Sequence, residues 1–337
     1  MSQVLRLGTR GSQLALWQAN TVAAALAAAG GPPCEIVVIR TSGDQLQSAP
    51  LSQVGGKRLF VKEIEDALLR GDVDLAVHSS KDMPAVLPEG LAIAGVLPRE
   101  DPLDALVLPA MADGSGLMDG KAISHQPSAI EDVLQRLGQS PSIGTGSVRR
   151  IAQLTRLLPG ARFTPIRGNL DTRLRKLDQR EHDALVLAAA GLRRLGFASR
   201  ISFPLPVEVC VPAPGQGIVA IEIREDDNAV RAATAPMSDP EAAAALVAER
   251  ALVETLGGGC QTPVGALATP AEGDRLELVA VVVALDGSRA VRGQATGSHS
   301  EAAALGARLG AQLIADGADG ILAEARRAQG AVEGIQP

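Results

Sequence analysis

Short apolar runs alternate with segments of helical periodicity along most of this chain, and polar or glycine-rich turns follow many of the runs. Parallel strands joined by helices produce this alternation, and the carboxyl ends of such strands meet at one edge of the sheet. Open α/β sheets bind their ligands outside that edge, so residues in these turns are the first candidates for a functional site. The predicted strands cover residues 4–7, 35–39, 75–77, 91–97, 106–108, 142–143, 163–166, 184–189, 207–211 and 218–223.

The turn that ends at Pro84 is the most informative of these. Residues 75–77 are apolar, and the run stops in the polar sequence Ser79-Ser80-Lys81-Asp82. The pattern predicts a buried strand that delivers Asp82 to the sheet edge as a fixed negative charge or general acid/base, with Lys81 as the neighbouring cation. A solvated Lys-Asp turn before a proline gives the same pattern, so these residues alone leave both interpretations open.

The first turn of the chain is a second candidate. The run at 4–7 enters Gly8-Thr9-Arg10-Gly11-Ser12, and Ser12 is a natural N-cap for a helix that ends near Gly30. Free amides at a helix start, together with the guanidinium of Arg10, make an anion site. An ordinary strand-to-helix turn with an exposed Arg10 fits the same residues equally well.

Positive charge is concentrated in one segment of an acidic protein. The formal net charge is -6, yet residues 145–200 contain twelve Lys or Arg against four Asp or Glu. This excess predicts an anionic partner. Three successive turns place arginines at strand ends or helix starts, where they repel one another unless an anion lies between them, and guanidinium groups suit carboxylates or phosphates. These turns hold Ser147 with Arg149 and Arg150, Arg167 with Arg173, and Arg194; we expect Arg156, Arg162, Arg175 and Arg180 to be surface charges.

A chain of 337 residues is too long for one ordinary core. The turn at residues 98–102 is the first predicted domain boundary, and the Pro/Gly linker at 212–217 predicts that the chain crosses back to the first domain. Two hinged lobes with a cleft between them follow from this. We expect a first domain at 1–99 and 217–236, a second at 103–212, and an α+β third at 239–332.

Two segments lack the regular alternation of strands and helices. Residues 45–56 form a long polar stretch with little periodicity, which fits a lid or a plain loop. Residues 111–142 begin rich in Gly, Ser and Asp and become helix-like from Ser128 to Leu137, which indicates an insertion or an embellished first helix.

Cys34, Cys210 and Cys260 are widely separated and lack metal-ligand spacing, which argues against a disulfide framework and against a zinc site. Cys260 follows three glycines, so it is the best candidate for covalent attachment, although a lone cysteine is by default a small buried hydrophobe. The start of the chain lacks the features of a secretory signal, and no uncharged apolar stretch reaches the length of a membrane helix. We therefore expect a cytoplasmic protein.

Seven motifs, in this order, resemble those of the porphobilinogen deaminase family, also called hydroxymethylbilane synthases. They are Gly8-Thr9-Arg10-Gly11-Ser12 with Leu14-Ala15-Leu16-Trp17-Gln18, Val54-Gly55-Gly56-Lys57 with Leu59-Phe60-Val61-Lys62-Glu63, Val77-His78-Ser79-Ser80-Lys81-Asp82-Met83-Pro84, Ser147-Val148-Arg149-Arg150, Arg167-Gly168-Asn169, Gly215-Gln216-Gly217 and Gly258-Gly259-Cys260-Gln261. The resemblance spans nearly the whole chain.

The resemblance implies an α/β fold with two lobes like those of periplasmic binding proteins. The lobes have mixed, mainly parallel sheets around a hinged cleft, and a small α+β third domain contains a three-stranded antiparallel sheet. It also implies a dipyrromethane cofactor in thioether linkage to Cys260. The enzyme would join four porphobilinogen molecules head to tail with loss of ammonia, and then release linear hydroxymethylbilane for tetrapyrrole synthesis. Each pyrrole ring carries an acetate and a propionate, which supplies the anion that the basic segment requires.

Residue roles are implied by matching motif positions. Asp82 matches the catalytic carboxylate, which stabilises positive charge on the pyrrole nitrogens. The positions that hold the cofactor correspond to Cys260, Lys81, Asp82, Thr145, Ser147, Arg149, Arg150 and Arg173. The positions that hold the substrate or growing chain correspond to Arg10, Ser12, Arg167 and Arg194. The chain departs from the family pattern at Arg58, Gly146 and Gly257, and in the length of residues 111–142.

Two other classes of protein share some of these features. A nucleic-acid binder would explain the basic segment, but the chain has one Trp, four Phe and no Tyr to stack on bases. A two-lobed solute receptor would explain the lobes, but it needs neither Asp82 nor Cys260. We therefore expect a monomeric enzyme that acts on porphobilinogen, without a metal and without a nucleic-acid or membrane partner.

Overall fold

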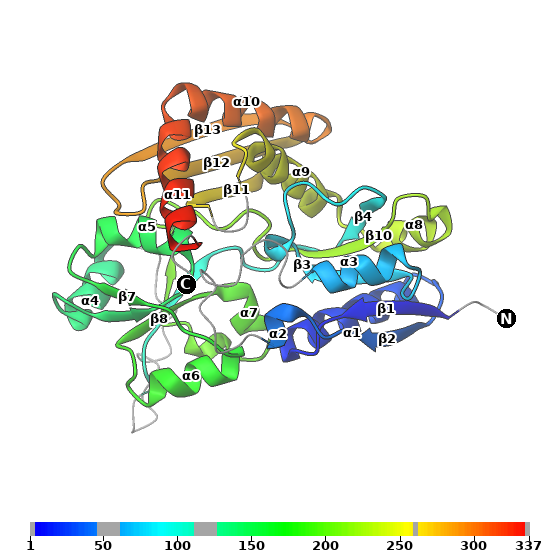
Figure 1. The fold of residues 1–337 in the computed structure, drawn as a ribbon, viewed down its shortest axis with the longest axis horizontal. Coiled ribbons are helices and arrows are strands. Elements are labelled where there is room, and N and C mark those ends of the chain that lie inside the picture. Colours follow the sequence, from blue (N-terminus) through cyan, green and yellow to red (C-terminus); the bar gives the residue numbers. More distant parts are fainter. Residues whose placement is uncertain (1–3, 46–60, 111–126, 259–261, 334–337) are drawn as a thin grey trace.

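The computed structural model describes residues 4–45, 61–110, 127–258 and 262–333. Within them the strands form three sheets, two of five strands and one of three. Figure 1 shows the first lobe on the right, the second lobe on the left and the third unit above both. Among the helices in these ranges, none is long and apolar enough to cross a membrane.

The first lobe is built on a sheet with the strand order β2-β1-β3-β10-β4. Its strands are β1 (Leu5–Thr9), β2 (Cys34–Val38), β3 (Leu75–Ser79), β4 (Leu91–Val96) and β10 (Val219–Arg224). Its helical segments are α1 (Gln13–Ala28), α2 (Ser42–Gln45), α3 (Lys62–Leu69), the 3-10 turn η2 (Ser80–Asp82), α8 (Asn228–Thr234) and the 3-10 turn η4 (Ala235–Met237). Apolar residues of α1 and α8 pack on one face of the sheet, and those of α3 pack on the other.

The second lobe repeats this plan with the strand order β7-β6-β8-β5-β9. Its strands are β5 (Asp104–Val107), β6 (Ser142–Gly144), β7 (Arg162–Thr164), β8 (Ala184–Ala188) and β9 (Phe203–Leu205). Its helical segments are α4 (Pro127–Leu137), α5 (Val148–Leu157), α6 (Leu170–Asp178), α7 (Ala189–Arg194) and η3 (Ala198–Arg200). Apolar residues of α4 and α5 cover one face, and those of α6 and α7 cover the other.

Each five-stranded sheet contains one strand that runs against the other four. In the first lobe this strand is β10, which pairs antiparallel with β3 and β4; in the second lobe it is β5, which pairs antiparallel with β8 and β9. These are the strands by which the chain enters the second lobe and returns to the first. The two crossings touch, because the amide of Glu100 donates to the carbonyl of Gly217 at 3.0 Å.

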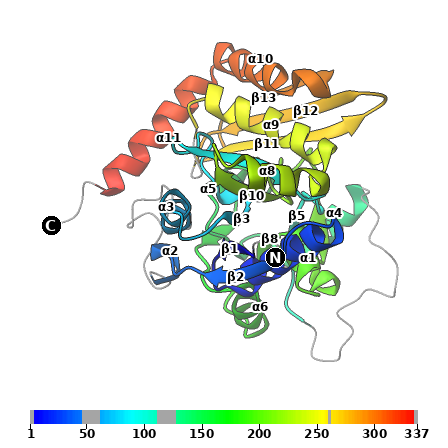
Figure 2. The same cartoon turned by 90° about the vertical axis from the view of Figure 1, so that its right-hand side faces the viewer.

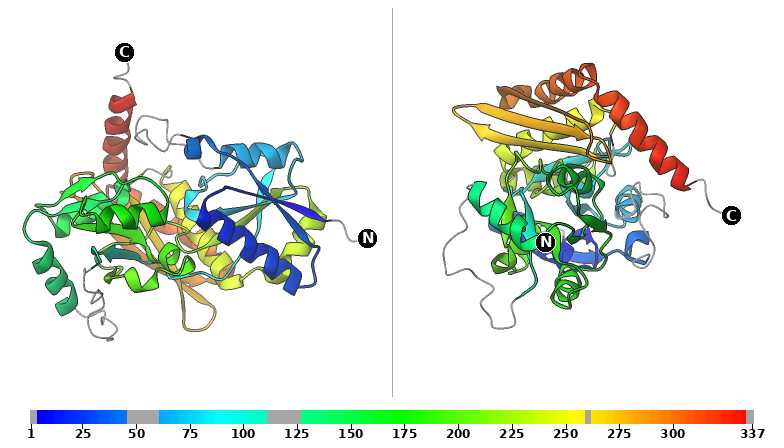
Figure 3. Two further views of the ribbon diagram at one scale, coloured as in Figure 1. Left: turned by 90° about the horizontal axis from the view of Figure 1, so that it is seen from below. Right: turned by 90° about the vertical axis from the view of Figure 1, so that its left-hand side faces the viewer.

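The third unit is an antiparallel sheet with helices packed against it. Its strands are β11 (Val264–Ala271), β12 (Arg275–Val283) and β13 (Ala290–Ser298), and its helical segments are α9 (Pro240–Thr255), η5 (His299–Glu301), α10 (Ala302–Ala315) and α11 (Ala318–Glu333). Its core contains apolar residues of all three α-helices. The carboxyl end of α11 projects away from this sheet in Figures 2 and 3. The expected fold class, two mainly parallel α/β lobes and a small α+β unit, is thereby confirmed.

One predicted strand is wrong. Residues 207–211 form no strand, because the amides of Val209 and Cys210 both donate to the carbonyl of Pro206 and turn the chain. The strand of this region is β9, a few residues earlier. The helix expected at 128–137 is present as α4, whereas the possible lid at 45–56, Arg58 and residues 111–126 fall almost wholly outside the described residues.

The crossing at Gly217 gives the first testable prediction. Gly217 has φ 87°, and a Cβ there would lie 2.2 Å from the carbonyl oxygen of Glu100. Gly30 has φ 77° with nothing within 4 Å of its Cβ position, so it controls for backbone strain alone. We expect Gly30→Ala to lower the free energy of unfolding by about 1 kcal/mol. Gly217→Ala should lower it by about 1–3 kcal/mol more. Urea unfolding measures both, and equal losses would contradict the close approach of the crossings.

Candidate active site

The predicted site residues occupy the carboxyl ends of parallel strands in both lobes. Strand β3 leads into η2 with Lys81 and Asp82, and β1 leads into the turn with Arg10 and Ser12. In the second lobe, β6 leads to Thr145 and Ser147, β7 to Arg167, and β8 to α7 with Arg194. The topology therefore delivers the candidate residues to the ends of the sheets where α/β proteins bind ligands.

The start of α1 lies beside Asp82. The Ser12 hydroxyl accepts a hydrogen bond from the amide of Ala15 at 3.3 Å, which confirms the predicted N-cap. Arg10, Ser12, His78 and Asp82 line one small pocket of about 60 Å³. The structure thus brings a predicted substrate cation and the predicted catalytic carboxylate together at the free amides of a helix start.

The turn that carries Asp82 is held from several sides. The amide of Ser80 donates to the carbonyl of Ile218 at 3.0 Å, and the amide of Met83 closes the turn on the carbonyl of Ser80 at 3.1 Å. The side chain of Gln18 on α1 donates to the hydroxyl of Ser79 at 2.8 Å. Met83 is buried in the core behind the turn. These contacts fix the backbone of the turn that carries Asp82.

Lys81 is a cation in a poorly solvated and already positive environment. Its Nζ donates to Oε1 of Gln216 at 3.3 Å. Burial lowers the pKa of Lys81 to about 8, and the charge of Arg150 lowers it further, while the carboxylates of Asp82 and Asp104 oppose the shift. An anion bound beside this amine would favour its charged form.

Sequence reasoning missed one buried carboxylate of the site, Asp104 at the start of β5. It is fully buried, and its two oxygens accept from Arg149 Nη1 at 2.7 Å and from Arg150 Nε at 2.9 Å. Burial alone would raise the pKa of Asp104, but the charges of the two arginines lower it well below its ordinary value. Arg149 and Arg150 therefore have an anion of the protein itself between them.

Each of the two arginines also donates to a backbone carbonyl, whereas the buried Arg149 Nε has no hydrogen-bond partner among the described residues. Arg149 Nη1 donates to the carbonyl of Val211 at 2.7 Å, and Arg150 Nη1 donates to the carbonyl of Val186 at 2.9 Å. The side-chain Nε2 of Gln216 adds a further hydrogen bond to Asp104 at 2.9 Å. A carboxylate that bound to Arg149 or Arg150 would therefore contact an arginine that is already paired with Asp104.

Thr145 and Ser147 shape the start of α5. The Ser147 hydroxyl accepts from the amide of Arg150 at 3.5 Å and caps the helix. Thr145 is buried, and its hydroxyl accepts from the amide of Ser147 at 3.3 Å. Both predicted cofactor residues thus fix the turn that orients Arg149 and Arg150.

Three other arginines of the site have no ion pair among the described residues. Arg173 Nε donates to the carbonyl of Gly168 at 2.8 Å, and Arg194 Nη2 donates to the carbonyl of Gly217 at 2.6 Å. Burial lowers the pKa of Arg173 to about 10, with the nearby charges of Arg150 and Arg167 adding to the shift. Burial also lowers the pKa of Arg167 and of Arg194. Positive charge in the second lobe exceeds the negative charge that the described residues supply to it.

The arginines expected at the surface are exposed or half-exposed, and one of them also joins two units. Arg156 Nη1 donates to the carbonyl of Gly287 in the third unit at 2.9 Å. Arg180 has a positive φ of 64° at the end of the α6 turn. Neither residue contacts the network around Asp104 in the described part of the structure.

The cysteines divide into two described residues and Cys260, which lies outside the described residues. Burial raises the pKa of the Cys210 thiol to about 12 and raises that of Cys34. Thiols of this kind are poor nucleophiles at neutral pH because the thiolate is the reactive form. Cys210 donates to Asp104 at 3.4 Å, so it belongs to the buried network.

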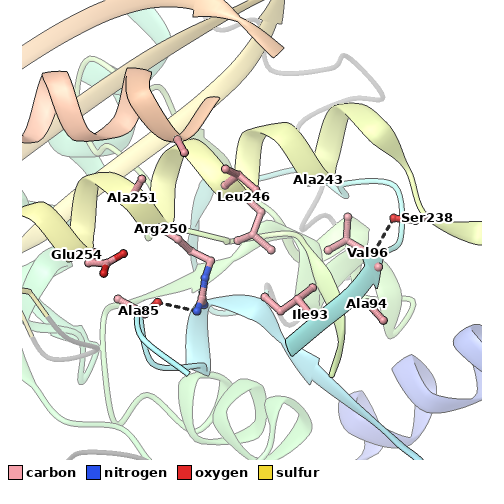
Figure 4. A pocket seen from close by; sticks show the side chains of 13 residues that line it. Ala85, Ile93, Ala94, Val96, Ser238, Ala243, Leu246, Arg250, Ala251 and Glu254 are labelled. Atoms are coloured by element: carbon pink, nitrogen blue, oxygen red, sulfur yellow. Dashed lines mark hydrogen bonds between the residues drawn. The ribbon is translucent and has the colours of Figure 1, made fainter. Parts of the chain in front are cut away.

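A larger pocket of about 370 Å³ lies between β4 and α9, away from these groups, and Figure 4 shows it. Its lining includes Ile93, Val96 and Leu246, and Arg250 donates to the carbonyl of Ala85 at 2.6 Å beside it. None of the predicted site residues lines it. A choice of site by pocket volume alone would therefore have missed the predicted site residues.

Known families match nearly the whole chain. The family described as "Porphobilinogen deaminase, dipyromethane cofactor binding domain" matches residues 5–232. The family described as "Porphobilinogen deaminase, C-terminal domain" matches residues 243–315.

Individual relatives agree with these matches. The chain is 46% identical to a porphobilinogen deaminase of Geobacter metallireducens, over 95% of this chain and 94% of the relative. It is 44% identical to one of Syntrophobacter fumaroxidans, over 97% and 99% of the two chains. It is 45% identical to one of Syntrophotalea carbinolica, over 96% of each.

More distant likenesses occur among solved structures. An ancestral cationic amino acid solute binding protein matches with a TM-score of 0.38 and 15% identity, over 69% of this chain and 87% of its own. Immunogenic lipoprotein A of Vibrio vulnificus matches with a TM-score of 0.38 and 14% identity, over 71% and 96%. The description of the lobes rests on their strand order and not on these likenesses.

Replacement of Asp104 tests the buried network. Asp104→Asn would leave two buried guanidinium groups without their counter-charge, and we expect the free energy of unfolding to fall by about 3–5 kcal/mol. Asp72→Asn is the control, because Asp72 pairs with Arg70 at the surface and should contribute less than about 1 kcal/mol. Urea unfolding of both variants measures the difference.

The pH dependence of this difference has a definite sign. The pKa of Asp104 is lower in the folded chain than its ordinary value of 3.8, so its stabilisation is complete above about pH 4 and is lost only as pH falls towards the folded value. The gap between wild type and Asp104→Asn should therefore be constant from pH 8 to about pH 5. A gap that closed within this window would contradict the assignment of an ionised Asp104.

Proposed function

This chain belongs to the porphobilinogen deaminase family, and from that premise we propose which of its residues hold the cofactor, hold the substrate and assist the reaction. The enzyme condenses four porphobilinogen molecules head to tail with loss of ammonia and yields linear hydroxymethylbilane for tetrapyrrole biosynthesis. It uses a dipyrromethane cofactor. The observation that carries the residue assignment is that Asp82 shares a pocket with Arg10 and Ser12, while three arginines of the second lobe without an ion pair among the described residues lie in the turns and helices that follow β7 and β8, namely Arg167, Arg173 and Arg194.

The charges of the site fit such a cofactor. Lys81 and Arg173 are destabilised as cations by burial and by other cations, as their lowered pKa values of about 8 and about 10 record. A dipyrromethane carries an acetate and a propionate on each of its rings, and these carboxylates would supply the missing negative charge. When bound, the group supplies the pyrrole carbon to which the first substrate is joined.

We assign cofactor binding to the cations and hydroxyls nearest the Asp104 network. Lys81 and Arg173 would pair with cofactor carboxylates directly. Arg149 and Arg150 would also attract a cofactor carboxylate. The two guanidinium groups share the single negative charge of Asp104, so one positive charge remains. Thr145 and Ser147 would orient them from the start of α5 and donate from their hydroxyls. Cys260 provides the thioether.

Asp82 is the catalytic carboxylate of the proposal. Its turn is fixed by backbone hydrogen bonds and by buried Met83, so its charge is held in place before the substrate arrives. Departure of the amine from porphobilinogen leaves positive charge on the pyrrole nitrogen. A carboxylate already oriented towards that nitrogen stabilises the charge without reorganising during the reaction.

The substrate side of the proposal uses the remaining cations. Arg10 and Ser12 lie in one pocket with Asp82, and would hold a substrate carboxylate beside the reacting ring. Arg167 and Arg194 reach from the second lobe and have no ion pair among the described residues. They would hold carboxylates of the substrate or of the growing chain.

We retain the predicted domain limits of 1–99 with 217–236, 103–212, and 239–332 as part of the proposal. The crossings described above, at the ends of β4 and β9, support them. We also propose that the enzyme is monomeric and cytoplasmic and has no nucleic-acid or membrane partner. Light scattering on the purified protein would test the monomer.

Cofactor attachment is tested by intact-protein mass. The protein should be heavier than its sequence by a two-pyrrole adduct, and Cys260→Ser should lack the adduct. Cys34→Ser is the matched control and should keep it, because the raised pKa of that thiol disfavours the nucleophilic thiolate. An adduct that survives in Cys260→Ser would refute the assignment.

The role of Asp82 is tested by kinetics on cofactor-loaded protein. Asp82→Asn should keep the fold and the adduct, while kcat for porphobilinogen consumption falls on the order of 10²-fold or more, because the lost interaction is strongest in the transition state. Asp82→Glu keeps the charge but displaces it and should retain partial activity. Asp72→Asn should behave as wild type. Normal turnover by Asp82→Asn would show that the turn is structural only.

A further inference from the structure

Arg194 is held across the junction of the two lobes. It lies at the end of α7 in the second lobe, and its Nη2 donates to the carbonyl of Gly217 in the chain crossing at 2.6 Å. No carboxylate of the described residues lies within ion-pair distance of it. Its guanidinium therefore keeps donors that the described protein does not use.

The other contact of this guanidinium is an aromatic ring of the first lobe. Arg194 Cζ lies 5.5 Å from the centre of the Trp17 ring, within the range of a cation–π interaction. Trp17 belongs to α1, which lies against α7 in Figure 1. Trp17, the only tryptophan of the chain, is 36% exposed, so the contact lies at the surface.

These contacts constrain the guanidinium in complementary ways. A ring beneath the plane restricts its tilt, and a carbonyl at one Nη restricts its rotation about the side-chain axis. Arginine side chains otherwise lose substantial rotamer freedom when they bind a carboxylate. An arginine that is already oriented loses less of that freedom on binding, so its affinity for the carboxylate is greater.

We propose that Trp17 is a positioning residue for Arg194. In this assignment, which rests on the proposed function, the indole face holds the guanidinium so that its unused donors meet a carboxylate of the substrate or growing chain. Trp17 itself touches no reacting atom. The contact also joins α1 to α7, so the same interaction that orients Arg194 ties the two lobes together beside the site.

Steady-state kinetics separate positioning from simple packing. Trp17→Leu keeps an apolar side chain but removes the ring face, and should raise the KM for porphobilinogen about two- to fivefold with little change in kcat, the size expected for a partly exposed cation–π contact. Trp17→Phe keeps a weaker face and should fall between. Asn20→Ala, one turn further along the exposed side of α1, is the matched control and should match wild type.

The single tryptophan also gives a readout that does not depend on turnover. Arg194→Gln should change the emission of Trp17 in the protein without substrate, whereas Arg193→Gln should not, because Arg193 pairs with Asp101 at the surface. Addition of porphobilinogen should change the emission of wild type and of Arg193→Gln with the same concentration dependence. Arg194→Gln should lose this response.

The results distinguish this inference from the function on which it rests. If wild type consumes porphobilinogen but Trp17→Leu has the KM of Asn20→Ala, the inference is overturned and the function stands. The inference is also overturned if Trp17→Leu lowers only the thermal stability, or if Arg194→Gln leaves the emission of Trp17 unchanged. Absence of turnover by cofactor-loaded wild type would instead refute the proposed function.

Discussion

One buried carboxylate, that of Asp104, holds together the part of the molecule where the lobes meet. It stands at the start of β5, where the chain enters the second lobe, and receives two arginines from α5. Gln216, on the returning crossing, donates to it and accepts from Lys81 of the first lobe. A buried charge of this kind is tolerated only when its partners are complete, so the geometry of both crossings is coupled to the charge of the site.

The network balances only part of the positive charge around it. Arg149 and Arg150 have Asp104, whereas Lys81 and Arg173 are half-buried cations whose pKa values are lowered. A fold that holds such cations with too little counter-charge gives up stability at that point, as is common where a ligand is bound. Anionic pyrroles would restore the balance, so the same arrangement that lowers the stability of the fold favours their binding. The acidic net charge of the whole chain conceals this local excess.

The sequence predicted the parts of the site that depend on local order. The Ser12 cap, the strand that leads to Asp82 and the polar turn after it follow from apolar runs that stop at polar residues, and all three lie where expected. Asp104 could not be found this way, because its partners are about 45 residues away and it looks like the polar first residue of an apolar strand. The displaced strand at Phe203–Leu205 has a similar cause, since two apolar runs flank Pro206 and only the turn geometry decides which one pairs.

The third unit adds a constraint on where the cofactor can be. Glu249 on α9 is fully buried and accepts from Arg99 on the outgoing crossing at 2.6 Å and from the amide of Gly215 on the returning crossing at 2.5 Å. The same helix ends at Thr255, five residues before Cys260 in the sequence. Helices are stiff over this length, so the last turn of α9 is held in place by the two crossings and by the first lobe, where Arg250 of α9 donates to the carbonyl of Ala85.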